Sequence, residues 1–120
     1  MIPSAITEEE RYTMVNLRGH TTGLPMNIWI GPRSGARHAA RIKVQMDHRE
    51  RFNLRKLAVV SVEGTATPAR IVAGNLSTAD LELVRHYVAL NREAIIAHWR
   101  EETDGGQLLQ MLKPLQENTQ

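Results

Sequence analysis

The ten residues RHAARIKVQM, 37–46, set the architecture, because apolar and polar side chains alternate along them. Ile42 and Val44 occupy one set of positions, and Arg41 and Lys43 occupy the other. A period of two residues predicts a β-strand with one face in a core and one face toward solvent. Such a strand is stable only beside partner strands, so the flanking segments have to supply them.

The neighbouring segments supply three more strands. MNIWIG (26–31) is rich in β-forming residues and is joined to the central strand by a Gly/Pro turn, which predicts an antiparallel hairpin. KLAVVSVEG (56–64) and ARIVAG (69–74) predict a third and a fourth strand. The polar segment DHRERFNLR (47–55), here called the arm, is expected to be an irregular loop.

After the strands the apolar period becomes helical, and a long helix is predicted over 77–102. Ser77 and Asp80 have the spacing of a capping pair at its start. Trp99 and Tyr87 lie on its apolar face and are expected in the core. Asp104 is suited to cap a short final helix over 107–113, which a proline then ends.

Strands followed by helices indicate an α+β protein, with a small antiparallel sheet packed against the long helix and the short final helix. The predicted domain covers 26–115, and 116–120 is expected to be a frayed tail. Residues 1–25 are interpreted as an extension: a capping-box spacing predicts a short helix over 8–17, and GHTTGLP (19–25) is typical of a turn.

Composition narrows the possible functions. The chain has 120 residues, no cysteine, and no apolar run of the roughly 18 residues that a membrane span needs. Its first residues do not resemble a secretory signal, so we expect a cytoplasmic protein without membrane contact. Thiol chemistry and thiolate metal sites are excluded. His86 and His98 lie about 18 Å apart along one helix, too far to share an ion, so no metal or other cofactor is expected.

Several features resemble one family of small bacterial proteins. The segment AGNLS precedes the long helix, that helix ends in NREAIIAHW, and the closing segment ends in LKPL. This order is similar to the family called Domain of Unknown Function 4160, over about residues 38–115. The resemblance implies a gene paired with another small gene in toxin–antitoxin fashion, but no established activity. It makes His38 the position of interest, with five fold markers: Gly74, Leu76, Trp99, Pro114 and Leu115.

The family strand usually carries the motif His-x-His. This chain has only the first histidine, His38, and Ala40 occupies the position of the second. The arm also resembles an insertion relative to the family. These departures leave the role of His38 open.

Positive charge is concentrated in residues 31–56, where eight Arg and Lys against two acids give 8 − 2 = +6, while the whole chain carries +2. Such a surface is suited to RNA or DNA, because phosphate contacts supply affinity without sequence selectivity. One alternative is that the surface binds an acidic protein partner, encoded by a neighbouring gene. The other is that these charges are only solvated and bind nothing. The predicted binding residues are Arg33, Arg37, Arg41, Lys43, Arg49, Arg51 and Arg55.

Two further functions stay open. A metal-independent ribonuclease needs a histidine as acid or base and cations that hold the developing phosphorane charge. His38 with Arg37 and Arg41 supplies these groups, and His48 is the candidate second proton carrier. The same alternation places His38 on the side of Ile42, which favours a partly buried, structural histidine. A protein-interaction subunit without a nucleic-acid role is the last alternative.

Overall fold

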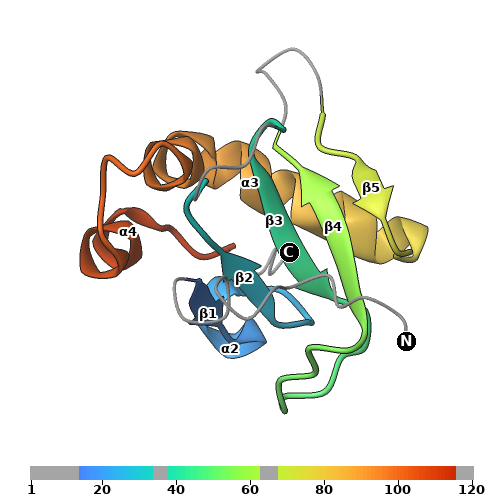
Figure 1. The fold of residues 1–120 in the computed structure, drawn as a ribbon. Helices are drawn as coiled ribbons and strands as arrows, with labels where there is room; N and C mark the ends of the chain where they lie inside the picture. Colours follow the sequence, from blue (N-terminus) through green and yellow to red (C-terminus); the bar gives the residue numbers. More distant parts are fainter. Residues whose placement is uncertain (1–13, 34–37, 63–67, 116–120) are drawn as a thin grey trace.

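The predicted central strand forms the middle of a five-stranded antiparallel sheet whose strands follow one another in chain order (Figure 1). The structure is a computed structural model that describes residues 14–33, 38–62 and 68–115. The strands are β1 (Val15–Leu17), β2 (Ile28–Ile30), β3 (Arg41–Gln45), β4 (Leu57–Ser61) and β5 (Ile71–Ala73). The helices are α2 (Gly19–Thr22), α3 (Thr78–Trp99) and α4 (Gly105–Met111). The α+β class is therefore confirmed.

The core lies between the sheet and α3, which crosses one face of it (Figure 1). Ile42 and Val44 are buried there, as their alternation predicted, and β3 aligns them with Val60 and Ala58 of β4. Val84 and Tyr87 of α3 are equally buried and belong to the same apolar cluster. One sheet face is thus dry because one stripe of α3 covers it.

The opposite face of the sheet is not a simple solvated face. Gln45 was expected on the wet side, yet its side chain is fully buried. The arm returns over this end of β3 and surrounds it with polar partners. Trp29 and Leu57 form a second small apolar cluster on which Phe52 packs. Period-two alternation identified the two faces correctly but could not show that a later loop covers part of one.

The N-terminal prediction was wrong for the residues that the structure describes. Instead of the end of a helix over 8–17, residues 15–17 form β1, which pairs with β2 as an edge strand. Leu17 is buried opposite Ile28, whereas Asn16 between the apolar residues is exposed. Pairing with β2 prevails over a weak capping signal, and residues 14–25 are part of the sheet domain rather than an extension. Residues 1–13 and 116–120, the predicted tail, lie outside the described residues.

The expected turn over 19–25 contains one helical turn, α2, which is followed by Gly23 as its C-cap with a φ of 83°. Thr22 is buried, and its carbonyl accepts a hydrogen bond of 2.7 Å from the Leu115 backbone N–H. The chain segment after α4 is thereby fastened to α2. Leu115, expected as a fold marker, supports the fold through this contact.

α3 begins where the capping pair predicted and ends three residues earlier, at Trp99. Ser77 Oγ accepts a hydrogen bond of 3.1 Å from the Asp80 backbone N–H. The helix is kinked at Asn91, whose φ is −112°. The Asn91 side chain exchanges two hydrogen bonds, of 2.8 and 2.7 Å, with the backbone of Lys113. The kink thus anchors the C-terminal segment.

α4 begins with the predicted cap. Asp104 and Gln107 form a reciprocal capping box, in which each side chain accepts a hydrogen bond from the other residue's backbone N–H. The helix ends at Met111, two residues before the predicted end at 113. Among the residues that the structure describes, no helix combines the length and the hydropathy that crossing a bilayer requires.

Tyr87 makes the core sensitive to alkaline pH. Burial raises the pKa of its hydroxyl from 10.0 to about 12. Between these values the unfolded chain releases the proton while the folded chain retains it, so stability is complete below pH 10 and falls as pH rises toward 12. We expect Tyr87→Phe to lose part of this alkaline destabilisation. Urea unfolding at pH 8, 10 and 11.5 measures the free energy of unfolding of both proteins. An equal loss of this free energy in the wild type and in Tyr87→Phe between pH 8 and 11.5 would contradict the prediction.

Candidate functional site

The predicted basic residues do not share one environment. Arg33 lies at the far end of α3, where its backbone N–H donates to the Trp99 carbonyl at 2.9 Å. Arg41 and Lys43 on β3 are half-buried, and Lys43 already makes an interaction within the chain. Arg37 lies outside the described residues. The three predicted residues of the arm are all exposed: Arg49, Arg51 and Arg55.

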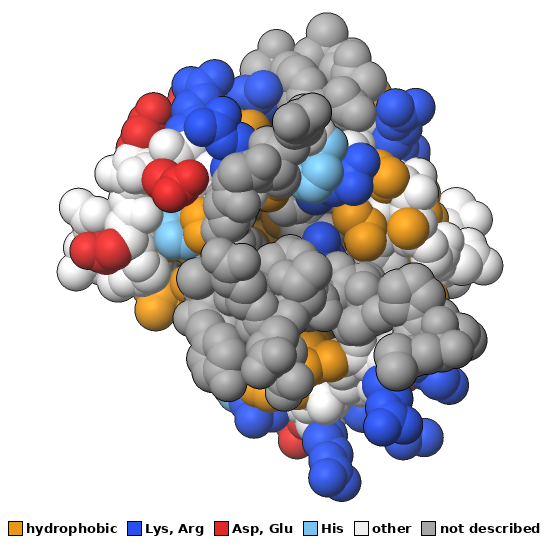
Figure 2. Space-filling model, viewed as in Figure 1, with side chains coloured by type: hydrophobic (Ala, Val, Ile, Leu, Met, Phe, Trp, Pro, Cys, Tyr) orange, Lys and Arg blue, Asp and Glu red, His pale blue; other side chains and the backbone are white. Residues whose placement is uncertain are grey.

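The surface view agrees with this division. Figure 2 shows Lys and Arg side chains in separate groups near opposite edges of the visible face, with hydrophobic side chains between some of them. Arg33 lies at the C-terminal end of α3, whereas the arm contacts the N-terminal end of that helix through His48, so the described basic residues of 31–56 do not form one cluster. The arm is the part of this stretch where consecutive exposed arginines lie close along the chain.

The arm is held from inside by Gln45. Its Nε2 lies within hydrogen-bond distance of the carbonyls of Arg49 and Arg51, at 3.0 and 3.1 Å. Its Oε1 accepts a hydrogen bond of 2.9 Å from the Asn53 backbone N–H. A fully buried amide thus contacts three backbone groups of a loop that has no regular structure. The two Nε2 hydrogens are shared among the two carbonyls and Asp47 Oδ1, which lies 2.6 Å away. The carbonyls of these two arginines face inward while their side chains are exposed.

Asn27 supports the arm from the other side. This buried residue donates from Nδ2 to the carbonyl of Glu50 at 3.0 Å and approaches Gln45 Oε1 at 3.3 Å. Its Oδ1 accepts a hydrogen bond of 3.1 Å from the Gly19 backbone N–H. Asn27 and Gln45 therefore form a buried amide pair that joins the start of α2 to the arm. Neither residue is recognisable from the sequence, since an Asn before a strand or a Gln at the end of one has no distinctive spacing.

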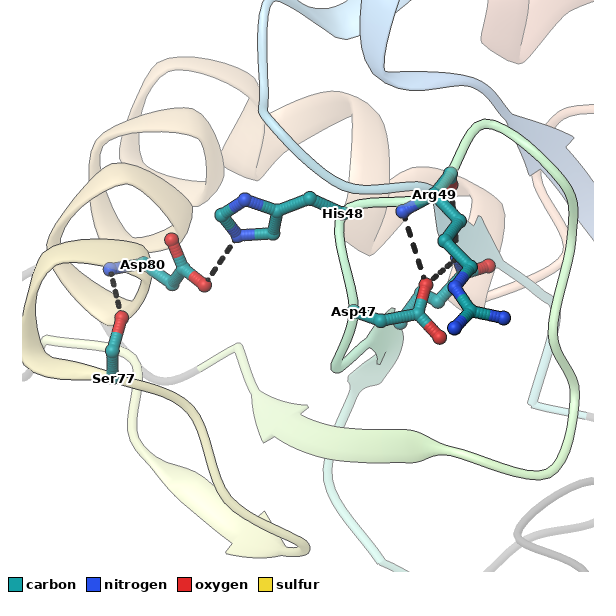
Figure 3. A network of polar contacts seen from close by, with 6 residues as sticks. Asp47, His48, Arg49, Ser77 and Asp80 are labelled. Atoms are coloured by element: carbon teal, nitrogen blue, oxygen red, sulfur yellow. Dashed lines mark hydrogen bonds and ion pairs between the residues drawn. The ribbon is translucent and has the colours of Figure 1, made fainter.

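Asp47 closes the arm at its base. Its carboxylate accepts hydrogen bonds from Asn53 Nδ2 at 3.1 Å and from Gln45 Nε2 at 2.6 Å. It also accepts one from the Arg49 backbone N–H at 3.1 Å (Figure 3). These bonds, led by the one from Asn53, lower the pKa of Asp47, because they favour its charged form. The acid inside the arm is thus occupied by internal contacts.

An aromatic residue fixes the outer side of the arm. The Phe52 ring lies 5.5 Å from the Trp29 ring, and the Arg18 guanidinium lies 4.3 Å from the centre of the Phe52 ring. Arg18 also donates to the Glu50 carbonyl at 2.7 Å. The arm is therefore held by apolar, cation–π and hydrogen-bond contacts together.

His38 does not take the position expected for it. β3 begins at Arg41, so His38 precedes the strand and is exposed instead of facing inward with Ile42. Its ring lies 5.3 Å from the ring of Trp99, and its Nδ1 is 2.9 Å from the Ala39 carbonyl. The pairing with β4 extends to Arg41, with one more backbone hydrogen bond of 2.8 Å from the Val62 N–H to the Ala40 carbonyl, so it stops before His38.

His48 lies at the other end of α3. Its Nε2 is 2.8 Å from Asp80 Oδ2, in the first turn of the helix (Figure 3). His38 contacts Trp99, which is 99 − 80 = 19 residues further along α3, or about 28 Å at 1.5 Å per residue. The two histidines therefore do not meet, and the structure gives no support to a proton-transfer pair made of them.

The remaining histidines form no metal site. Among the described residues there is no group of three or more potential metal-ligating side chains. His98 is buried at the corner between α3 and α4, where Nδ1 lies 3.1 Å from the Thr103 carbonyl. Burial lowers its pKa, so this histidine is a neutral structural residue at neutral pH.

Comparison of the chain with protein-family models, with curated proteins and with solved structures finds no match. The resemblance to Domain of Unknown Function 4160 therefore stays a prediction. Two of its fold markers have clear physical roles: Gly74 adopts a φ of 77°, and Leu76 is buried just before α3. Trp99 is half-buried against the core, as expected, and Pro114 is exposed.

Proposed function

We propose that this protein is a nucleic-acid-binding module and that the arm is its contact with the phosphate backbone. The observation that carries the proposal is the inward bonding of the Arg49 and Arg51 carbonyls to one buried amide, Gln45. Because the backbone of the arm is held in place, binding through the exposed arginines costs little backbone conformational entropy.

The chemistry of these side chains favours phosphate. A guanidinium donates two parallel hydrogen bonds to an anion, and it stays charged at any physiological pH. Of the two acids in the arm, Asp47 is engaged by the arm itself, which leaves Glu50 as the other negative group. Contacts of this kind supply affinity without reading bases, so we expect RNA and DNA of mixed sequence to bind alike.

The proposed surface is smaller than the one predicted from sequence. Arg33 lies near the C-terminal end of α3, and Lys43 is engaged within the chain, so neither is included. Arg41 lies at the start of β3, at the opposite end of the strand from the arm. The proposal therefore rests on the three exposed arginines of the arm.

Retardation of mixed-sequence RNA and DNA in gels tests the proposal. We expect binding at 20 mM salt, and a steep loss of affinity as salt rises. The double variant Arg51→Ala/Arg55→Ala should lower the slope of log affinity against log salt by about 1.5, since each lost phosphate contact contributes about 0.7 to 0.9.

The matched control is Arg70→Ala/Arg100→Ala, which removes the same charge from exposed positions outside the arm. Its slope should stay within experimental error of the wild type. Equal losses in the two double variants would show that net charge alone attracts the polymer. No retardation at 20 mM salt would overturn the proposal, and an acidic protein partner would then be the better hypothesis.

The protein partner implied by the family resemblance stays a second proposal. The observation that favours it is that Leu83 and Leu90, seven residues apart on the outer side of α3, are 38% and 46% exposed. Large apolar residues in this spacing lie on one helix face. If the product of a neighbouring gene binds there, Leu83→Lys/Leu90→Lys should abolish co-purification with that product while nucleic-acid retardation persists.

A further inference from the structure

A cavity of about 170 Å³ opens between α2 and the arm, and four of its nine lining residues are Arg or His. His20 and His48 both line it, although 48 − 20 = 28 residues separate them in the chain. Arg18 and Arg49 line it as well, and Glu50 is the acidic residue among its lining. Two imidazoles and two guanidiniums at one cavity are an unusual concentration for a chain whose net charge is only +2.

The His48 ring is oriented by a carboxylate. Asp80 Oδ2 lies 2.8 Å from Nε2, and the Asp80 side chain is 12% exposed. An ionised carboxylate only accepts, so the hydrogen of the neutral ring lies on Nε2 and Nδ1 carries a lone pair. Figure 3 shows Nδ1 on the edge of the ring turned away from Asp80. A histidine held in this way by an acid is prepared to accept a proton.

One of the two guanidiniums is also held in place. Arg18 donates to the Glu50 carbonyl at 2.7 Å and lies over the Phe52 ring. A cation that is positioned before a ligand arrives stabilises negative charge that develops in a transition state, with little reorganisation. His20 is exposed on α2, where an incoming ligand can reach it.

We propose that this cavity cleaves RNA by internal transesterification. His48 Nδ1 accepts the proton of a ribose 2′-hydroxyl, and the 2′-oxygen attacks the adjacent phosphorus. The bond from phosphorus to the 5′-oxygen breaks as the His20 imidazolium donates its proton to that oxygen. The products are a 2′,3′-cyclic phosphate and a 5′-hydroxyl, and Arg18 and Arg49 stabilise the phosphorane charge.

This inference rests on the proposed function, because the arm that would hold the RNA also forms one wall of the cavity. Asp80 acts through His48 and is a positioning residue. The site differs from the one that sequence analysis predicted around His38, and it replaces His38 by His20 as the partner of His48. DNA is expected to bind without being cleaved, since it has no 2′-hydroxyl.

Purified protein is incubated with end-labelled, mixed-sequence single-stranded RNA in EDTA, and the new ends are identified. We expect products that end in 2′,3′-cyclic phosphate. His48→Ala and His20→Ala should each lower the cleavage rate at least about 100-fold, the usual effect of removing a general acid or base. His86→Ala, at an exposed histidine on α3, is the matched control and should cleave like the wild type.

Because His48→Ala also removes the contact with Asp80, His48→Gln serves as a second variant that retains an N–H donor for Asp80 but cannot accept the proton. Asp80→Asn should lower kcat about tenfold or more and leave KM unchanged. Urea unfolding of this variant should match that of the wild type, since a partly unfolded sample would also lower the apparent kcat. Retarded RNA that stays intact with the wild type would overturn this inference and leave the proposed function standing. Cleavage that persists in both His48 variants would overturn the assignment of His48.

Discussion

Gln45→Ala is expected to lower the free energy of unfolding by about 4 kcal/mol, because it removes a fully buried side chain and leaves polar groups without partners. The Arg51 carbonyl and the Asn53 backbone N–H lose the hydrogen bonds that Gln45 provides. Each unsatisfied buried group costs about 1 to 3 kcal/mol, and the deleted volume adds a cavity. Urea unfolding followed by tryptophan fluorescence measures the change.

The same substitution should weaken nucleic-acid binding under conditions where the variant is still folded, since the arm loses its internal anchor. Gln110→Ala is the matched control, because Gln110 is exposed on α4 and its removal should leave stability and binding unchanged. A Gln45→Ala protein within about 1 kcal/mol of the wild type would mean that other contacts hold the arm. The proposal that the arm is preorganised would then lose its main support.

Gly74→Ala is expected to lower the free energy of unfolding by about 3 kcal/mol. Gly74 has a φ of 77°, and a Cβ there would lie 2.7 Å from Ala58 Cα and 2.8 Å from the Leu57 carbonyl oxygen. The left-handed backbone alone costs a residue with a side chain about 1 to 2 kcal/mol. The atoms in the way belong to the backbone of β4, so they cannot move aside without disturbing the sheet.

Gly106→Ala provides the comparison at a glycine that can accept a side chain. Among the described residues, a Cβ at Gly106 would meet only the Asp104 side chain, at 3.4 Å, and alanine favours the helix that contains it. We expect its stability to equal or slightly exceed that of the wild type. Equal stability of the two alanine variants would contradict this prediction. It would mean that β5 moves away from the edge of the sheet at little cost, and that the close approach of Gly74 to β4 is not important for stability.

Much of the fold could be read from local patterns. The alternation around Ile42 predicted β3 and its buried face, and Ser77 predicted where α3 begins. Asp104 was predicted correctly as the cap of α4, although that helix begins at Gly105, two residues before the predicted 107. These signals act over two to four residues, so the chain around each one is enough to produce them. β1 was missed because three residues have little pattern of their own and become a strand only by pairing with β2.

The candidate site was predictable only in part. The arginines of the arm are visible as a run of charge, but the amide that holds them is not. Asn27 and Gln45 are 18 residues apart in the chain, and nothing near either residue indicates that the other will meet it in a buried pair. His48 was a candidate, but the structure places it against Asp80, far from His38, with which the sequence paired it.

Local sequence therefore dictates which segments are strands and helices, which stripe of each is apolar, and where positive charge can lie. Tertiary structure assigns Gln45 to the interior, places His48 against Asp80 across 32 residues, and separates His48 from His38 by the length of α3. The physical reason is range: periodicity and capping are set by neighbours in the chain, whereas burial and hydrogen-bond partners depend on which distant segments the packed core brings together.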